Sequence, residues 1–134
     1  MISAFQKLNA PFIIQDFIKD ANGSDLRLFV IGGKVIASMM RSSSDDDFRS
    51  NLHAGGKANT VKITQEERRI AKQAVKAMGL NIAGVDILRS NEGPKVLEVN
   101  SSPGLQGIES INDINIASLI IDYVEKRLGL SKIT

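Results

Sequence analysis

The sequence predicts an α+β fold in which a mainly antiparallel sheet is flanked by helices. Two pairs of apolar runs are close enough along the chain to form hairpins, residues 25–31 with 34–40 and residues 84–90 with 95–100. A segment with helical periodicity follows each of these pairs. Because the strands do not alternate regularly with helices, we expect an antiparallel rather than a parallel sheet.

The composition limits the class of protein. A chain of 134 residues that is 43% hydrophobic can bury one core, and its net charge of +2 does not indicate a direct nucleic-acid partner. The absence of cysteine excludes disulfides, zinc–thiolate sites and thiol nucleophiles. No apolar run approaches the roughly 20 residues of a membrane span, and no signal-peptide pattern is present. We therefore expect a soluble, cytoplasmic protein without a membrane partner.

The first half of the chain contains the first predicted hairpin. Residues 2–9 have apolar side chains at helical spacing but no preceding cap, as expected if the sequence starts within a helix. Residues 11–18, "PFIIQDFI", predict a short buried strand. Gly32 and Gly33 join the strands 25–31 and 34–40 at the two-residue distance of a tight hairpin. Residues 41–60 show no periodicity.

The second half begins with a helix. Thr64 and Glu67 have the spacing of a capping box, and Gly79 ends the helix that they start at about residue 78. The strand "GVDILRS" is separated from "KVLEVN" by a turn, which we expect to comprise residues 90–94. An amphipathic helix is predicted over residues 114–128.

The second hairpin carries the most informative side chains. Glu98 and Asn100 project from one face of their strand, about 6.6 Å apart, while Leu97 and Val99 face the core. A turn over residues 90–94 would place Asp86 opposite Glu98, with side chains about 5 Å apart. Two facing carboxylates repel, so a cation is expected between them. This all-oxygen set suits Mg²⁺ or Mn²⁺ shared with phosphate groups, and the alternative is an exposed sheet face whose carboxylates align by chance.

Three motifs carry a family resemblance. The runs "VDIL", "LEVNSSPGLQGIE" and "FRSNLHAGG" resemble the RimK-type branch of the ATP-grasp superfamily. These α-L-glutamate ligases include the enzyme that adds glutamates to the C-terminus of a small-subunit ribosomal protein. The resemblance runs from about residue 11 to the last helix. It implies an ATP-grasp ligase that forms a peptide C–N bond through an acyl-phosphate, using ATP, Mg²⁺ or Mn²⁺, glutamate and a ribosomal protein C-terminus or another carboxylate acceptor.

The resemblance also implies a domain assignment. Residues 1–134 correspond to the C-terminal portion of an ATP-grasp domain, without the N-terminal domain and the small subdomain that full-length members have. We therefore expect this fragment alone to be inactive and to bind ATP weakly at best. The apolar residues of its cleft wall are candidates for self-association into a homo-oligomer.

Site residues follow from the same resemblance. It makes Asp86, Glu98 and Asn100 the metal ligands and places Arg49 at the acyl-phosphate being formed. Because phosphoryl transfer depends on charge neutralisation, we expect Arg41 to join Arg49 in catalysis. Asp25 would meet the ribose hydroxyls and Arg27 the phosphates. The adenine base would be bound by an extended segment that comprises Gln15, Asp16, Phe17 and Ile18. The remaining nucleotide contacts would come from Arg49, Ser50 and Asn51 in the loop "FRSNLHAGG".

Several alternatives stay open. Asp25 and Arg27 are also typical of a polar strand edge, and the loop around Arg49 of a mobile surface segment. His53, the only histidine, is expected to pack in its loop rather than act as a general base. The ligase could serve another substrate, as in lysine-biosynthesis or cofactor-glutamylating relatives. A non-catalytic metal-binding or ribosome-docking module is the remaining alternative.

Overall fold

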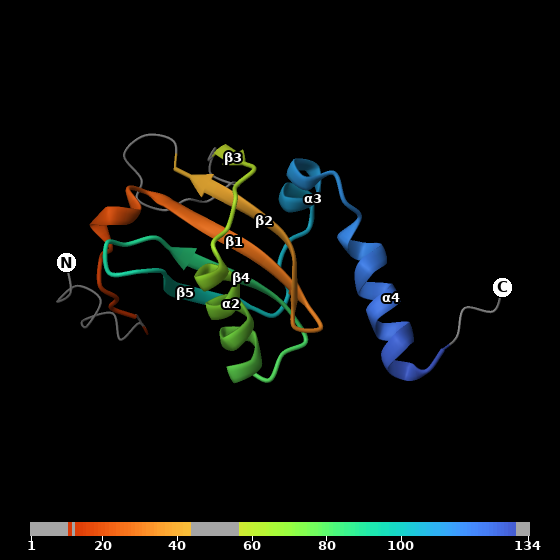
Figure 1. Ribbon diagram of the computed structural model, residues 1–134. Coiled ribbons are helices and arrows are strands. Elements are labelled where there is room, and N and C mark those ends of the chain that lie inside the picture. Colours follow the sequence, from red (N-terminus) through yellow and green to blue (C-terminus); the bar gives the residue numbers. More distant parts are fainter. Residues whose placement is uncertain (1–10, 12, 44–56, 131–134) are drawn as a thin grey trace.

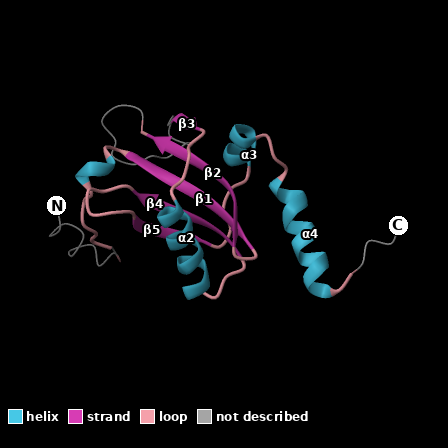
Figure 2. Ribbon diagram, viewed as in Figure 1, coloured by secondary structure: helices cyan, strands magenta, loops and turns pink. Residues whose placement is uncertain are grey.

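The structure is a computed structural model that describes residues 11, 13–43 and 57–130. Its strands form one five-stranded sheet in the order β3-β2-β1-β4-β5, and every neighbouring pair is antiparallel, which confirms the α+β prediction (Figure 1). The strands are β1 (Ser24–Ile31), β2 (Lys34–Ser42), β3 (Lys57–Asn59), β4 (Ile82–Leu88) and β5 (Lys95–Asn100). The helices are the short η1 (Lys19–Ala21), α2 (Gln65–Ala77), α3 (Gln106–Asn112) and α4 (Ile116–Leu128) (Figure 2).

The β1–β2 hairpin turns at the predicted pair of glycines. Gly32 and Gly33 have φ angles of 55° and 75°, and Ile31 pairs with Lys34. Positive φ at both central residues defines a turn whose twist matches that of the two strands, and glycine adopts it without steric cost. The turn sets the pairing of Ile31 and Val30, and a β-bulge at Ile36 then shifts the register by one residue, which brings Arg41 opposite Asp25.

Helix α2 begins and ends as the sequence predicts. The Thr64 hydroxyl accepts a hydrogen bond from the Glu67 amide at 3.1 Å, and the Glu67 carboxylate accepts one from the Thr64 amide at 2.7 Å. Arg89 donates from Nε to the same carboxylate at 2.7 Å, which ties the helix start to the end of β4. Glu67 is 3% exposed, so its charge is held inside this set of donors.

Strand alternation divides the core into two parts. Leu26, Leu28 and Val30 of β1 pack on the face that α2 covers, which we call the α2 face. Phe29 and Ile31 point to the opposite side, where α3 and α4 cover them, and we call this the α3–α4 face. The α2 face is completed by Ala71, Val75, Ala83, Val85 and Ile87, and the α3–α4 face by Ala37, Met39, Ile108 and Ile116.

The β4–β5 hairpin reaches the predicted pairing by an unpredicted route. Asp86 pairs with Glu98 as expected, but Leu88 pairs with Lys95, so the connection comprises residues 89–94 rather than 90–94. The register then shifts by one residue between Asp86 and Ile87, which leaves Leu97 in a β-bulge. Leu97 is 38% exposed, and its expected place in the core is therefore wrong.

Three other expectations differ from the structure. Residues 13–18 contain no strand, and Ile13 and Ile14 are 86% and 70% exposed, because no strand of the described sheet pairs with them. The segment 41–60 contributes the end of β2 and the short β3, and α3 was not predicted. The predicted helix over residues 2–9 lies outside the described residues. No helix in the described ranges is long and apolar enough to cross a membrane.

Candidate functional site

Five charged side chains follow one another across the sheet. Asp25 and Arg27 lie two residues apart on β1, on the α3–α4 face but beyond the residues that these helices cover. The register places Arg41 of β2 opposite Asp25, Asp86 of β4 opposite Arg27, and Glu98 of β5 opposite Asp86. We call Asp25, Arg27, Arg41, Asp86 and Glu98 the charged row.

Asp86 is the centre of the charged row. Arg27 donates to it in bidentate fashion, from Nε to Oδ1 at 2.8 Å and from Nη2 to Oδ2 at 2.7 Å. Arg41 donates from Nη2 to the same Oδ2 at 2.6 Å. Arg41 also binds Asp25 through two contacts, of which the one from Nε to Oδ1 measures 3.0 Å. The two guanidinium groups therefore link three strands through paired, planar hydrogen bonds.

The inner part of the charged row is buried. Asp25 and Asp86 are each 2% exposed and Arg41 is 8% exposed. Burial by itself would raise the pKa of Asp86, but hydrogen bonds and positive charge from Arg27 and Arg41 outweigh it and lower that pKa. Burial likewise opposes the charge on Arg41, and Asp25 and Asp86 more than compensate, so its pKa is raised. These ions are stable only as a group.

Glu98 forms the exposed end of the row. Its side chain is 57% exposed and lies 3.7 Å from the Arg27 guanidinium, and it is within hydrogen-bonding reach of Asp86. Partial desolvation and the Asp86 carboxylate raise the pKa of Glu98, and the two arginines only partly offset this. Among the described residues, the cation within ion-pair distance of Glu98 is Arg27.

Asn100 and the turn after it are held close to the sheet. The Asn100 side-chain oxygen accepts a hydrogen bond from the Ser102 amide at 2.9 Å, which stabilises the "NSSPG" turn. Asn100 pairs with Gly84, and a Cβ atom at residue 84 would lie 2.8 Å from Cβ of Pro103. Glycine at this position lets the turn pack directly on β4, beside the charged row.

The donor set is compatible with a divalent cation. Asp86 accepts three hydrogen bonds from arginines, which leaves one of the roughly four lone-pair positions of a carboxylate. Glu98 offers an exposed carboxylate beside it, and Asn100 an amide oxygen two residues further along the strand. Among the described residues no group of three or more His, Cys, Asp or Glu is placed to hold a metal. A cation here would therefore depend on two carboxylates, one amide oxygen and oxygens from water or phosphate.

The structure brings together part of the predicted site. Asp86 and Glu98 lie side by side on one face, as predicted. The arginines that join Asp86 were not predicted as its partners, because Arg27 meets Asp86 through the pairing of β1 with β4, and no hairpin turn joins these two strands. Gln15, Asp16, Phe17 and Ile18 lie before η1, outside the sheet. Arg49, Ser50, Asn51 and His53 fall outside the described residues.

The fold defined by these elements is that of the ATP-grasp enzymes. A D-alanine–D-alanine ligase from Bacillus anthracis, solved with ATP, matches with a TM-score of 0.65 and 18% identity over 96% of this chain and 46% of its own. The ATP-grasp ligase PsnB, solved with a precursor variant, Mg and ADP, matches with a TM-score of 0.65 and 23% identity over 85% of this chain and 34% of its own.

The family follows from the sequence match. The family profile described as "RimK-like ATP-grasp domain" matches residues 1–124, and the chain belongs to this family. A probable alpha-L-glutamate ligase from Hydrogenovibrio crunogenus is 60% identical over 126 residues, which is 94% of this chain and 42% of the relative. Another, from Methanococcoides burtonii, is 57% identical over 98% of this chain and 44% of its own length. The chain thus spans less than half the length of these relatives.

Proposed function

We propose that this chain is the C-terminal portion of an ATP-dependent carboxylate–amine ligase that adds glutamate to the C-terminus of a ribosomal protein. The observation that carries the proposal is the facing pair Asp86 and Glu98, in which two arginines bind Asp86 and the Glu98 carboxylate is exposed. The family and the names of its relatives as glutamate ligases support the reaction class.

The proposed reaction has two steps. An oxygen of the acceptor carboxylate attacks the terminal phosphorus of ATP, which gives an acyl-phosphate and ADP. The amine of the incoming glutamate then attacks the acyl carbon, phosphate leaves, and the amine proton passes to solvent. Neither step needs a protein nucleophile, which agrees with a chain that contains no cysteine.

In this scheme the charged row positions negative groups. Asp86, Glu98 and Asn100 would hold Mg²⁺ or Mn²⁺, which when bound neutralises phosphate charge. Arg27 and Arg41 keep Asp86 ionised and fixed in orientation, because each donates to a buried carboxylate oxygen. Arg41, together with Arg49, would face the negative charge that develops on the transferred phosphoryl group.

Nucleotide contacts would come from outside the row. Main-chain groups of Gln15, Asp16, Phe17 and Ile18 would bind the adenine edge, and Ser50 and Asn51 the phosphates. Asp25 would bind the ribose hydroxyls. Because Asp25 is 2% exposed and bound by Arg41, this last contact requires that the side chains around Asp25 move aside.

A chimeric enzyme tests the proposal. In this chimera the chain replaces the matching region of the Hydrogenovibrio crunogenus relative. ADP release is then measured in the presence of glutamate and a peptide that has the C-terminal sequence of the ribosomal protein. Glu98→Ala should abolish ligation, because the exposed carboxylate of the site is removed. Glu92→Ala is the matched control, since Glu92 lies in the hairpin turn and pairs only with Lys95 among the described residues.

The outcomes separate the alternatives. Ligation in the chimera that is unaffected by Glu98→Ala would refute the role of this residue. ADP release with another amine or another carboxylate, and none with glutamate, would move the chain to a ligase of different substrate. Because Glu98 and Asp86 repel each other, the variant should unfold at the same or a slightly higher denaturant concentration than the parent.

A further inference from the structure

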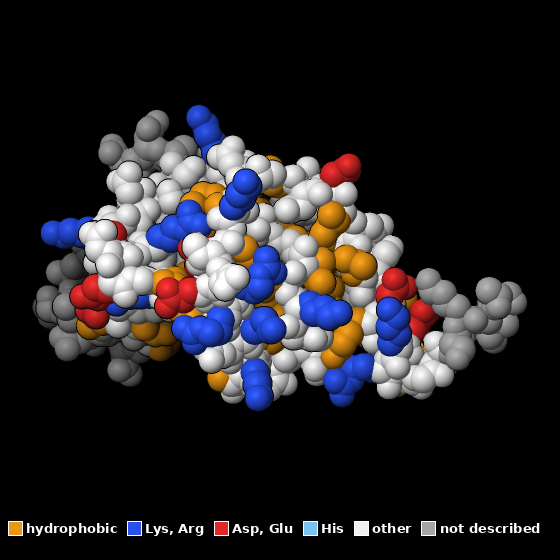
Figure 3. Space-filling model, viewed as in Figure 1, with side chains coloured by type: hydrophobic (Ala, Val, Ile, Leu, Met, Phe, Trp, Pro, Cys, Tyr) orange, Lys and Arg blue, Asp and Glu red, His pale blue; other side chains and the backbone are white. Residues whose placement is uncertain are grey.

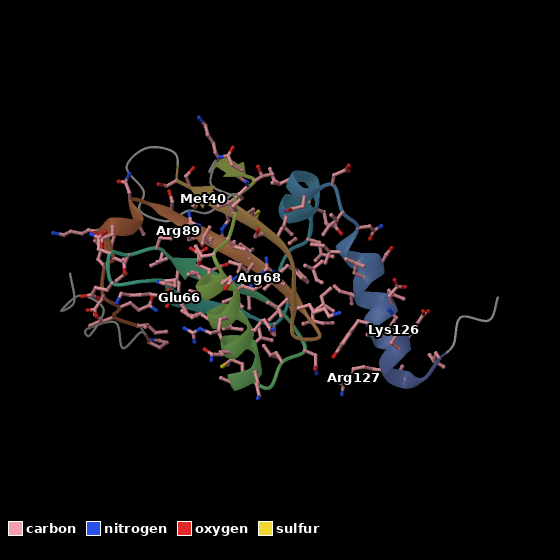
Figure 4. All side chains as sticks on the ribbon, in the orientation of Figure 1. Met40, Glu66, Arg68, Arg89, Lys126 and Arg127 are labelled. Atoms are coloured by element: carbon pink, nitrogen blue, oxygen red, sulfur yellow. The ribbon has the colours of Figure 1, made fainter. Side chains whose placement is uncertain are left out.

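The outer flank of α2 carries a row of positive side chains. Arg68, Lys72 and Lys76 are spaced four residues apart, which places them on one side of the helix, and Arg69 lies next to them. Figure 3 shows Lys and Arg side chains gathered over α2. Of these four residues, Arg68 is labelled in Figure 4. We call Arg68, Arg69, Lys72 and Lys76 the basic flank.

The basic flank borders a groove of about 720 Å³. The groove continues onto the β1–β2 turn at Gly33 and onto the segment after α2 at Leu80 and Asn81. Among the described residues no acidic side chain lines it, and the half-buried Leu80 supplies an apolar contact. A ligand in this groove would meet positive charge together with a limited apolar surface.

Much of this charge is not neutralised within the described residues. Arg69 lies 3.7 Å from Glu66 and donates to Gln73 at 2.9 Å, and Arg68 makes a long contact of 3.5 Å to the Val35 carbonyl. Neither the Lys72 nor the Lys76 side chain makes a hydrogen bond or ion pair with another described residue, and both residues are exposed. The two lysines are therefore available to an anionic partner.

The spacing of the cations matches one kind of anion. Residues four apart on an α-helix are separated by about 6 Å along its axis. In an extended peptide, alternate side chains project on the same side about 6.6 Å apart. A run of consecutive glutamates in extended conformation would thus present a carboxylate to each of Arg68, Lys72 and Lys76 in turn.

We infer that the α2 groove binds an acidic peptide made of consecutive glutamates in extended conformation. The inference rests on the proposed function, because repeated addition of glutamate produces such a peptide. The methylene groups of the glutamate side chains would contact Leu80, and the carboxylates would meet the basic flank. Gln65 and Gln73 can donate to the peptide carbonyls.

The groove is separate from the candidate active site. Helix α2 packs on Leu26, Leu28 and Val30, whereas the charged row lies on the opposite face of the sheet. A peptide held at the groove therefore does not occupy the position where phosphate and acceptor react. The groove would act as a second contact point for a product that has grown long enough to reach it.

A nucleic acid fits the groove less well. Proteins that bind single-stranded nucleic acid usually stack bases on aromatic side chains, and in the part of the chain that the structure describes no aromatic residue lines this groove. The chain as a whole has a net charge of only +2, so it lacks the broad positive surface that backbone binding requires.

Fluorescence anisotropy with labelled hexaglutamate tests the inference in this chain. Replacing both lysines, Lys72→Gln with Lys76→Gln, should weaken binding about tenfold or more, and raising salt from about 50 to about 200 mM should weaken it further. The matched control is Lys62→Gln with Lys126→Gln, which removes two exposed lysines outside the groove and should change affinity less than about twofold. Circular dichroism checks that both variants are folded.

Each outcome decides the inference. Hexaglutamate binding that the groove variant loses and the control retains supports it, and labelled hexaglutamine should not bind. It is overturned by equal loss in both variants, by no binding at all, or by tighter binding of a uridine hexanucleotide. The titration needs no ATP, so it is independent of the ligation assay. A chimera that ligates glutamate while the chain fails to bind hexaglutamate defeats this inference alone, and the reverse result defeats the proposed function alone.

Discussion

The two faces of the sheet are built from the same strands but are put to different uses. On the α2 face, buried apolar residues continue from Leu26 to Val30 along β1 and from Ala83 to Ile87 along β4. On the α3–α4 face, only the half that ends at Ile31 is apolar, and the other half is the charged row. Helices α3 and α4 lie toward the apolar half (Figure 1).

This difference shows how one strand serves packing and chemistry together. In β1 the side chains of Leu26 and Leu28 alternate with those of Asp25 and Arg27, so the residues that anchor the core also fix the charged residues between them. The side chains of the charged row are held in fixed positions, because their backbone belongs to a buried sheet. The candidate site begins where helical cover ends.

The largest expected effect on stability comes from a substitution in the charged row. Asp86→Ala should lower the free energy of unfolding by about 3–5 kcal/mol, because it leaves Arg27 and Arg41 without their shared counter-ion. Urea unfolding followed by circular dichroism measures the change. Glu66→Ala, which removes an exposed carboxylate from α2, should change it by less than about 0.5 kcal/mol. A loss below about 1 kcal/mol for Asp86→Ala would mean that the charged row does not stabilise the sheet.

A cavity on the α2 face should lower the free energy of unfolding slightly less. Leu28 is fully buried on the α2 face, and Leu28→Ala should lower the free energy of unfolding by about 2–5 kcal/mol. Leu97→Ala is the control within the same sheet, because the bulged Leu97 is 38% exposed and should lose clearly less. Equal losses at the two leucines would contradict the division between a packed face and an exposed bulge.

The third prediction concerns nucleotide binding at the half of the α3–α4 face that carries the charged row and that none of the described helices covers. We expect this chain alone to bind ATP with Mg²⁺ at least about 100-fold more weakly than the chimera, a difference of about 2.7 kcal/mol. The reason is that ATP-grasp enzymes enclose the nucleotide between two subdomains, and each missing phosphate contact costs about 1.5–3 kcal/mol. Calorimetric titration of both proteins measures it. Comparable affinities would show that residues 1–134 hold the nucleotide by themselves.

The smallest effect concerns the start of α2 at acid pH. Burial would raise the pKa of Glu67, but Arg89 and Thr64 outweigh it and hold that pKa below its ordinary value of 4.5. Its ionised form therefore stabilises the native chain above pH 4.5, and this contribution is lost as the pH falls through the lower native pKa. Glu67→Gln should cost about 1 kcal/mol at pH 7 and reduce the pH dependence below 4.5. Glu66→Gln is the control, and a parallel pH profile in both variants would contradict the assignment.

Local patterns in the sequence predicted most of the fold. The Gly32–Gly33 turn and the Thr64–Glu67 capping box are each set by a few neighbouring residues, and both are confirmed. Helix α3 was missed because it comprises only residues 106–112 and lacks a side-chain cap at its start. The strand expected at residues 11–18 is wrong because apolar character alone does not supply a neighbouring strand.

The candidate site was predictable in its carboxylates and not in its counter-ions. Parity along the second hairpin predicted that Asp86 and Glu98 meet, although the structure reaches this pairing through the bulge at Leu97. The bridging by Arg41 depends on side-chain reach across β1 to Asp86, and no periodic pattern encodes that distance. The sequence therefore indicated that positive charge is needed, while only the structure identifies two arginines that supply part of it.

The bulge at Leu97 has a consequence for how this hairpin can change in evolution. Without it, the pairing of Leu88 with Lys95 would continue to Asp86 with Leu97, and Glu98 would turn to the other face. The extra residue acts as a spacer that uncouples the length of the tip, residues 89–94, from the position of Glu98. An ancestor or descendant could therefore lengthen its tip by one residue while straightening the bulge, and its two carboxylates would still meet.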